Sequence, residues 1–343
     1  SRYTLSKASK ETVTTDEPIY VDVFLTGDMP SEFKRLQTET RQLLEEFTEV
    51  NANIIISYIN PKDENPNIDV LISEMEKYSM PALRIDVKEN GKTSQEVIFP
   101  WAVINHNKKV AKVSLIKTNA SNAIDRVNNS VQHLEYAFAS AFKEVTAEKS
   151  KTIGWLIGND QLESKYVFDF LNTLERNYHI IPVALDSADI KPIETLKNLQ
   201  KLDLLLSAKP QKTFSDNQKY VLDQFTINGG KSLWLIDAVH AEMDSISEKG
   251  QTLALGKELN LKDMFFQYGF RINPVLVKDM YASDIVLLDT NNQPNRYPWL
   301  YNPVVIPNTK HAIVNNINPV KFEFANTIDL VKQGVNIKKT ALL

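Results

Sequence analysis

The sequence predicts an α/β protein with two domains, and three observations lead to this prediction. The chain has 343 residues, and at roughly 150 residues per domain this length suits two separate cores. Short apolar runs typical of strands alternate with amphipathic helical patterns along most of the chain. A polar cluster at residues 146–151 separates two such series. We therefore expect one domain over residues 1–148 and a second over residues 149–343.

The first domain is expected to open with a β-α-β unit. Apolar side chains recur at every second position of residues 19–25, which is the period of a strand with two different faces. A helix should follow with Ser31 as its N-cap and apolar residues at helical spacing up to Phe47. Residues 53–58 are typical of a buried strand. Two strands joined by a helix are expected to run parallel.

Two hairpins should come next in the first domain. Residues 83–87 and 96–99 are typical of strands, and Asn90-Gly91 between them can adopt the positive φ angles of a tight hairpin turn. A second turn at residues 105–107 should lead into a strand over residues 110–116.

A long helix is expected to close the first domain over residues 122–147. Apolar residues recur there at alternating spacings of three and four, which indicates an amphipathic helix with one apolar face. This face is expected to pack in the core of the first domain, and docking of a partner or of the other domain is the alternative.

The second domain is expected to be a Rossmann-like or flavodoxin-like α/β domain with an irregular C-terminal part. Predicted helices alternate with four predicted strands, at 153–157, 180–185, 202–206 and 233–236. This alternation is typical of a mostly parallel sheet with helices on both faces. The best marked helix should begin with a capping box of Ser215 and Gln218 and end at Gly229-Gly230. Residues 291–308 are expected to form a long loop rich in Pro and Asn.

Composition excludes several classes of function. The 39 Lys and Arg residues face 43 Asp and Glu residues, so the formal net charge is −4 and there is no basic excess for nucleic acid. The absence of cysteine removes disulfides, thiolate nucleophiles and cysteine-bound zinc. No motif asks for a cofactor, and none is expected.

No apolar run approaches the roughly 20 residues that a membrane-spanning helix needs. The first residues also lack the apolar core of a signal peptide. Because the sequence begins with Ser rather than Met, we expect it to be part of a longer protein that is cut here.

A metal site is one candidate for chemistry, formed by Asp237, His240 and Asp244. His240 and Asp244 would share a helix face if this segment were helical, and Asp237 would lie at the carboxyl end of a strand. The alternative is that these residues cap or solvate the start of a helix. We regard that alternative as the stronger one and expect no metal.

Two other motifs are incomplete. Gly230-Lys231-Ser232 resembles the end of a phosphate-binding loop, but it lies between a predicted helix and a predicted strand, the reverse of the required order. Ser207 at a strand end lacks the flanking glycines of a nucleophile elbow and is expected to be a satisfied turn serine. A hydrolase that uses the carboxylates of Asp223 and Asp237 remains a minor alternative.

Aromatic side chains offer a possible interaction surface. Tyr297, Trp299 and Tyr301 alternate in a segment flanked by prolines, and Trp101 is a further candidate. The alternative is that these rings fold back on their own domain.

Several short segments together resemble one known family. They are Arg2-Tyr3-Thr4-Leu5-Ser6, Ile98-Phe99-Pro100-Trp101-Ala102, Leu134-Glu135-Tyr136, Leu222-Asp223-Gln224-Phe225, Asn228-Gly229-Gly230-Lys231, Tyr268-Gly269-Phe270-Arg271-Ile272-Asn273 and Pro298-Trp299. In this order and spacing, over essentially the whole chain, they resemble the GldG family of gliding-motility-associated ABC transporter components, labelled substrate-binding or auxiliary proteins.

The resemblance implies a protein anchored in the bacterial inner membrane by terminal helices outside this sequence, with its large soluble part in the periplasm. It implies association with a separate permease and a separate ATPase, and with other motility proteins. The family supplies no catalytic or metal residues to transfer.

We therefore expect a non-enzymatic transporter component that acts through protein contacts. The alternative is a solute receptor that holds a small molecule or glycan in a cleft between the two domains.

Overall fold

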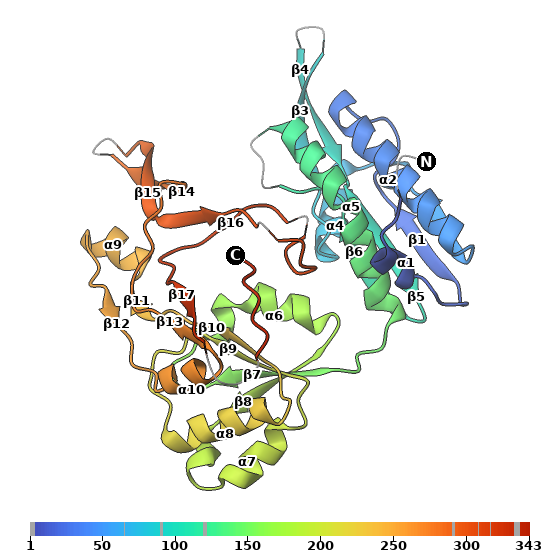
Figure 1. The fold of residues 1–343 in the computed structure, drawn as a ribbon. Coiled ribbons are helices and arrows are strands. Elements are labelled where there is room, and N and C mark those ends of the chain that lie inside the picture. Colours follow the sequence, from blue (N-terminus) through green and yellow to red (C-terminus); the bar gives the residue numbers. More distant parts are fainter. Residues whose placement is uncertain are drawn as a thin grey trace. The chain divides into compact units, whose positions relative to one another are not determined.

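The computed structural model describes residues 4–64, 66–89, 92–118, 122–289, 292–307, 309–315, 317–332 and 337–343. The chain divides into two compact units, an N-terminal unit of residues 1–149 and a C-terminal unit of residues 150–343. Each unit combines a sheet with helices and has its own buried core (Figure 1). Within the described ranges, no helix has the length and apolar character needed to cross a membrane.

A four-stranded mixed sheet forms the centre of the N-terminal unit. Its strands are β1 (Ile19–Val23), β2 (Ile54–Tyr58), β5 (Trp101–His106) and β6 (Lys109–Ser114), in the order β2-β1-β5-β6. Strands β1 and β2 run parallel, whereas β5 runs antiparallel to both β1 and β6. The predicted β-α-β unit is confirmed, because a helix joins the parallel pair.

Two long helices, α2 (Ser31–Val50) and α5 (Ala123–Thr146), pack on one face of this sheet. That face is apolar because β1 buries Ile19, Val21 and Val23 on it. Phe47 of α2 meets Phe142 of α5 with ring centroids 4.9 Å apart. The expectation that the long closing helix packs in the core of its own domain is confirmed.

The helix ends differ in how they satisfy free backbone groups. Helix α2 begins one residue earlier than expected, since Pro30 and not Ser31 is its N-cap. The Pro30 carbonyl accepts the N–H groups of Phe33 and Lys34. Helix α5 has Asn122 as its N-cap, and the Asn122 side chain accepts the N–H of Asp125 at 2.8 Å.

A second, smaller apolar cluster lies around α4 (Ile68–Lys77), which follows the short α3 (Pro61–Glu64). Leu71 and Met75 of α4 are buried with Phe99, and Trp101 of β5 packs against them. Neither of these helices, nor the short α1 (Lys7–Glu11), was predicted from the sequence. Helix α1 is tied to α5, because the Ser9 hydroxyl donates to Glu135 at 2.7 Å.

Both predicted hairpins of the N-terminal unit are present. Strands β3 (Leu83–Glu89) and β4 (Lys92–Ile98) pair antiparallel, and the expected Asn90-Gly91 turn lies outside the described residues. The turn between β5 and β6 falls at Asn107 and Lys108, with φ angles of 46° and 66°. These positive angles match the twist of a two-residue hairpin.

The C-terminal unit is built on a sheet of four parallel strands. They are β7 (Thr152–Ile157), β8 (His179–Ala184), β9 (Leu204–Ala208) and β10 (Ser232–Leu235), in the order β10-β9-β7-β8. All four predicted strands are confirmed. The chain adds β8 on one side of β7 and β9 on the other, so the direction of winding changes at β7.

Helices cover both faces of this sheet, as predicted (Figure 1). One face packs against α6 (Phe168–Glu175), which follows the single turn η1 (Ser164–Tyr166). The other face packs against α7 (Pro192–Leu199), α8 (Asp216–Ile227) and α10 (Lys262–Gln267), and the turn η2 (Asp186–Asp189) precedes α7. Trp155 lies in the first cluster and Leu156 in the second, because successive residues of a strand point to opposite faces.

Helix α8 starts and stops as the sequence predicts. The Ser215 side chain accepts the N–H of Gln218, and the Gln218 side chain accepts the N–H of Ser215, which completes the capping box. Gly229 has a φ of +93°, and the N–H of Gly230 donates to the Phe225 carbonyl at 2.9 Å. The Gly-Gly pair therefore ends the helix and turns the chain into β10.

The rest of the C-terminal unit contains more strand than the sequence analysis expected. Its elements are β11 (Val239–His240), α9 (Met243–Lys249), β12 (Leu255–Gly256), β13 (Phe270–Ile272), β14 (Ala282–Leu288), β15 (Pro294–Val305), β16 (Val320–Lys321) and β17 (Ile328–Leu330). The expected long loop at 291–308 is wrong for most of its length, since β15 pairs with β14. Only Val304 and Val305 also pair with β16. Although β15 is the middle strand of the order β14-β15-β16, most of its length pairs on one side only, and proline is tolerated where its missing N–H breaks no ladder.

Candidate functional site

The carboxyl ends of β7, β9 and β10 lie at one edge of the C-terminal sheet, because these strands run parallel. Asp160 and Gln161 follow β7, Lys209 follows β9, and Asp237 follows β10. In open α/β sheets, ligand sites form at this edge beside the strand where the winding changes direction. This edge, next to β7, is therefore the candidate site.

Lys209 is the charged centre of this edge. Its backbone is left-handed, with a φ of +51°, and its N–H donates to the Leu235 carbonyl at 2.7 Å. Its ammonium lies 2.8 Å from Glu242 and 3.6 Å from Asp237. Burial opposes the charge on Lys209, but the bond to Glu242 and the two negative charges outweigh it, so the pKa of Lys209 is raised.

Lys257, just after β12, differs from Lys209 in its hydrogen bonding and in the direction of its pKa shift. Its Nζ is buried and has no hydrogen-bond partner among the described residues. Burial lowers the pKa of Lys257, the charge of Asp237 opposes that shift, and the charge of Lys209 adds to it.

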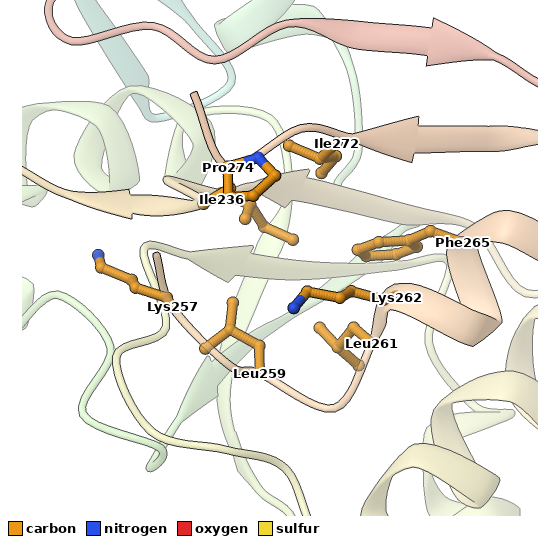
Figure 2. A pocket seen from close by; sticks show the side chains of 9 residues that line it. Ile236, Lys257, Leu259, Leu261, Lys262, Phe265, Ile272 and Pro274 are labelled. Atoms are coloured by element: carbon orange, nitrogen blue, oxygen red, sulfur yellow. The ribbon is translucent and has the colours of Figure 1, made fainter. Parts of the chain in front are cut away.

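A small pocket lies beside Lys257 (Figure 2). It holds about 370 Å³ of empty space, part of it open to solvent. In Figure 2, Ile236 and Pro274 face Leu259 across the pocket, while Lys257 lies at the end opposite Phe265. The ammonium of Lys262, a further lining residue, binds the Glu258 carboxylate. The pocket is therefore mostly apolar, and it contains no pair of groups arranged for acid-base chemistry.

A larger hollow lies at the carboxyl end of β7, with about 890 Å³ of empty space that includes open solvent. Gln161 lines it and also contacts β9. The Gln161 Oε1 atom accepts the Ser207 hydroxyl at 3.0 Å and the N–H of Ala208 at 2.9 Å. The loop after β7 is thus bonded directly to the next strand of the sheet.

The structure places the three metal candidates differently from what the metal hypothesis requires. His240 lies in strand β11, and α9 begins only at Met243, so His240 and Asp244 share no helix face. The helix over both residues that a shared face would require is not present, because pairing with β12 holds residues 239–240 extended. Asp237 instead interacts with Lys209. In the parts of the chain that are described, no three His, Asp or Glu side chains are grouped to hold a metal.

The incomplete motifs have structural roles. Ser207 is a buried residue inside β9 rather than in the turn after it, and its hydroxyl is satisfied by Gln161. Gly230-Lys231-Ser232 connects α8 to β10, so it runs from helix to strand as the sequence indicates. Asp223 on α8 accepts the Tyr268 hydroxyl at 2.6 Å. Asp223 and Asp237 therefore interact with different partners, Tyr268 and Lys209.

Comparison with known families identifies the unit that carries this edge. Residues 150–343, more than half of the chain, match the family described as ABC-type uncharacterized transport system. This chain belongs to that family. It is an auxiliary component of an ABC-type transport system. Residues 1–105 match a domain of unknown function, DUF7088.

Other comparisons add little to this ABC-type family assignment. No curated protein matches the chain. Among solved structures, the "mmIFT52 N-terminal domain" matches with 16% identity and a TM-score of 0.37, over 54% of this chain and 71% of that one. A likeness this weak carries no argument.

The four aromatic candidates of this ABC-type component do not share one environment. Trp101 belongs to the N-terminal unit, and its indole N–H donates to the Pro81 carbonyl at 2.9 Å. Trp299 and Tyr301 lie on β15 with ring centroids 5.6 Å apart, and Tyr301 also lies near Phe324. Tyr297 is the most exposed of the four, at 45%. Trp299 and Tyr301 therefore pack within the C-terminal unit.

Sequence reasoning missed Gln161, Lys209 and Lys257 in the ABC-type unit. None of the three belongs to a known motif. The only sequence signal for Gln161 and Lys209 is their position just after a predicted strand of a parallel sheet, where ligand sites form. Lys257 carries no such signal, since β12 was not predicted.

Proposed function

We propose that this chain is a non-enzymatic, GldG-like component of the ABC transporter used in gliding motility. It would act at the periplasmic face of the inner membrane, through contacts with the permease and other motility proteins. The family match over residues 150–343 supports a role in transport. The segments that resemble the GldG family support the more specific assignment.

The observation that carries a role in protein contacts is the β14-β15 hairpin. Figure 1 shows this two-stranded ribbon projecting from the rest of the C-terminal unit. Val286 is 58% exposed and Leu288 is 66% exposed, and both lie on one face of the ribbon, two residues apart. Leu287 lies on the opposite face and is 40% exposed. The ribbon thus presents aliphatic side chains to solvent on both faces.

A ribbon with exposed aliphatic residues suits a binding role. Transfer of apolar surface from water is worth roughly 25 cal/mol per Å², so contact with a partner would stabilise these residues. Exposed apolar patches of this kind commonly mark interaction sites. The pairing of Leu288 with Pro294 and of Val286 with Arg296 keeps the ribbon in register without a partner.

The two carboxylates considered for hydrolysis both interact with other side chains, which supports a non-enzymatic role. Asp223 is bound by the Tyr268 hydroxyl and Asp237 lies beside the ammonium of Lys209. A second carboxylate, that of Glu242, contacts the same ammonium, so Asp237 and Glu242 share one counter-charge.

The test is site-specific photo-crosslinking in cells that glide. A photoreactive residue at position 288 should crosslink to the permease, whereas one at Ile190 should not. Ile190 is a fair control because it is 82% exposed, is also aliphatic, and lies at the end of η2, away from the hairpin in sequence. Equal crosslinking at both positions, or none to the permease at position 288, would contradict the proposal.

A variant experiment separates binding from folding. The double variant Val286→Ser, Leu288→Ser should keep the melting temperature but reduce co-purification with the permease and slow gliding. The matched control is Ile190→Ser, Ile193→Ser, which also removes two exposed isoleucines. If only the control variant lost gliding, the β14-β15 hairpin would not be the surface that contacts the permease.

A further inference from the structure

Strand β2 has one edge that no other strand of the described chain covers. It is the first strand in the order β2-β1-β5-β6, so it pairs only with β1. Just after β2, the N–H of Ile59 donates to the Val23 carbonyl of β1. Successive residues of a strand direct their backbone groups to alternate sides, so Ile56 and Tyr58 direct their N–H and C=O groups away from β1. These groups are available to a further strand.

Two other sheet edges carry residues that discourage such pairing. Strand β6, at the opposite edge of the same sheet, carries Lys109 and Lys112, whose ammonium groups donate to the carbonyls of Ala147 and Tyr78. Strand β8, at one edge of the C-terminal sheet, contains Pro182, which has no N–H. Lysine and proline are common devices that protect an edge. Strand β2 has the sequence Ile-Ile-Ile-Ser-Tyr and contains neither of them.

Helix α2 carries one charge of each sign beside this edge. The guanidinium of Arg41 lies 4.3 Å from the centroid of the Tyr58 ring. Burial raises the pKa of Tyr58, the charge of Arg41 lowers it and the charge of Glu45 raises it, so both charges lie near this ring. Arg41 and Glu45 are both exposed, and neither forms an ion pair with another of the described residues. A surface with opposite charges one helical turn apart can complement a second copy of itself.

One twofold axis would satisfy both the backbone groups and the charges. Helix α2 joins two parallel strands, so it runs antiparallel to β2, with Arg41 level with Tyr58. A helix rises 1.5 Å per residue and a strand about 3.3 Å, which puts the midpoint between Arg41 and Glu45 roughly level with Ser57. An axis at Ser57 would pair two β2 strands antiparallel. It would also bring Arg41 of each copy to Glu45 of the other.

We propose that this chain forms a symmetric dimer through β2, in which two four-stranded sheets join into one sheet. Ile56 of each copy pairs with Tyr58 of the other, and their outward N–H and C=O groups bond to each other. Arg41 of each copy meets Glu45 of the other. Because the same surface of both copies makes the contact, the assembly closes as a dimer. This contact lies in the N-terminal unit and goes beyond the proposed role of the β14-β15 hairpin.

Sedimentation velocity of the whole chain is the first test. Pairing of one short strand suits a weak dimer, so we expect a dissociation constant of about 10–100 μM. The measured mass should rise with concentration towards twice that of one chain. A mass that stays at that of one chain up to about 300 μM would overturn the proposal.

Charge reversal tests which surface makes the dimer. Arg41→Glu and Glu45→Arg each place like charges at both contacts, so each variant alone should dimerise at least about tenfold more weakly. An equimolar mixture of the two variants places opposite charges at both contacts and should restore the dimer. The control Lys143→Glu reverses an exposed charge on α5 and should leave dimerisation unchanged. Failure of the mixture to restore the dimer, or an equal loss in the control, would contradict the proposal.

The absence of cysteine from the sequence allows a test of the register. In Ser57→Cys the two new thiols would lie directly opposite each other, at roughly the 4.5–5.5 Å between Cβ atoms of opposed residues, which is close to disulfide geometry. Mild oxidation with copper phenanthroline should therefore give a covalent dimer on non-reducing gels. The control Ser114→Cys places the thiol at an exposed position on β6 and should stay monomeric. Equal yields of covalent dimer from the two variants would overturn the pairing through β2.

Discussion

The ammonium of Lys209 lies 2.8 Å from the carboxylate of Glu242, which joins the end of β9 to the segment that precedes α9. The same ammonium lies 3.6 Å from Asp237, just after β10. The Lys209 side chain is only 24% exposed. One partly buried cation thus ties the irregular C-terminal segments to the parallel sheet.

Replacing this cation should destabilise the C-terminal unit. In Lys209→Met two carboxylates lose their counter-charge, and we expect a loss of about 1–2 kcal/mol in the free energy of unfolding. Urea denaturation followed by tryptophan fluorescence measures this loss. Three of the four tryptophans, Trp155, Trp234 and Trp299, lie in the C-terminal unit. The control Lys212→Met breaks an exposed pair with Asp160 and should cost less than about 0.5 kcal/mol.

The pH dependence of the same variant gives an independent check. The raised pKa of Lys209 means that its contribution to stability is fully present below its ordinary value of 10.5 and is lost as pH rises through the higher folded value. The stability difference between wild type and Lys209→Met should therefore stay constant up to about pH 10 and shrink above it. A difference that falls already between pH 6 and 8 would refute this account.

Lys257 should behave in the opposite way. Because burial lowers its pKa below 10.5, the folded state disfavours the charged amine, and the unfolded state binds more protons. Lys257→Met should raise the free energy of unfolding at low and neutral pH, and this gain should decline as pH rises towards 10.5. Lys197→Met, on the exposed side of α7, controls for the loss of one positive charge. A loss of stability in Lys257→Met would show that its ammonium has a stabilising partner.

The Tyr268 hydroxyl should stabilise the packing of α10 against α8. It donates to Asp223 at 2.6 Å, so Tyr268→Phe should cost about 1–2 kcal/mol at neutral pH. Burial, followed by the bond to Asp223, raises the pKa of Tyr268 above its ordinary value of 10.0. The contribution of the phenol is fully present below pH 10.0 and is lost as pH rises through the folded value. In thermal melts from pH 7 to 11, the stability difference between the two proteins should begin to shrink above pH 10. A difference that stays constant over the whole range would disprove the link.

The two glycines after α8 should respond differently to the same substitution. A Cβ at Gly230 would lie 2.5 Å from the Phe225 carbonyl oxygen, so Gly230→Ala must shift the backbone and should cost more than about 2 kcal/mol. Gly229 has open space around it but a φ of +93°, so Gly229→Ala should cost only about 1–2 kcal/mol. Denaturant midpoints rank the two variants. An equal cost would mean that backbone conformation, and not the contact with Phe225, governs this turn.

Much of the fold follows from local patterns. The parallel strands β7 to β10 were predicted because each is a short apolar run followed by a helical pattern, and a sheet covered on both faces needs such runs. The capping box of Ser215 and Gln218 was predicted because its groups lie within one helical turn. In both cases the interactions that decide the structure lie close together in the sequence.

The candidate site was much harder to predict. Gln161 matters because Ala208, 47 residues away, fixes its amide group, and no local pattern encodes that contact. His240 and Asp244 lie at a spacing that would suit one helix face, yet pairing with Leu255 makes His240 part of a strand. Pro298 suggested a loop, yet β14 supplies a partner that holds this segment extended opposite Asp284.

The sequence by itself therefore determined the α/β class, the main alternation of strands and helices, and the two ends of α8, since these depend on short-range periodicity and capping. Only the tertiary structure decided that Trp155 and Gln161 line one hollow, and that Lys209 meets Glu242. The physical reason is that parallel strands bring their carboxyl ends to one edge, so residues from distant loops become neighbours there. Their chemistry arises from burial and charge at that edge, which no single segment of the chain contains.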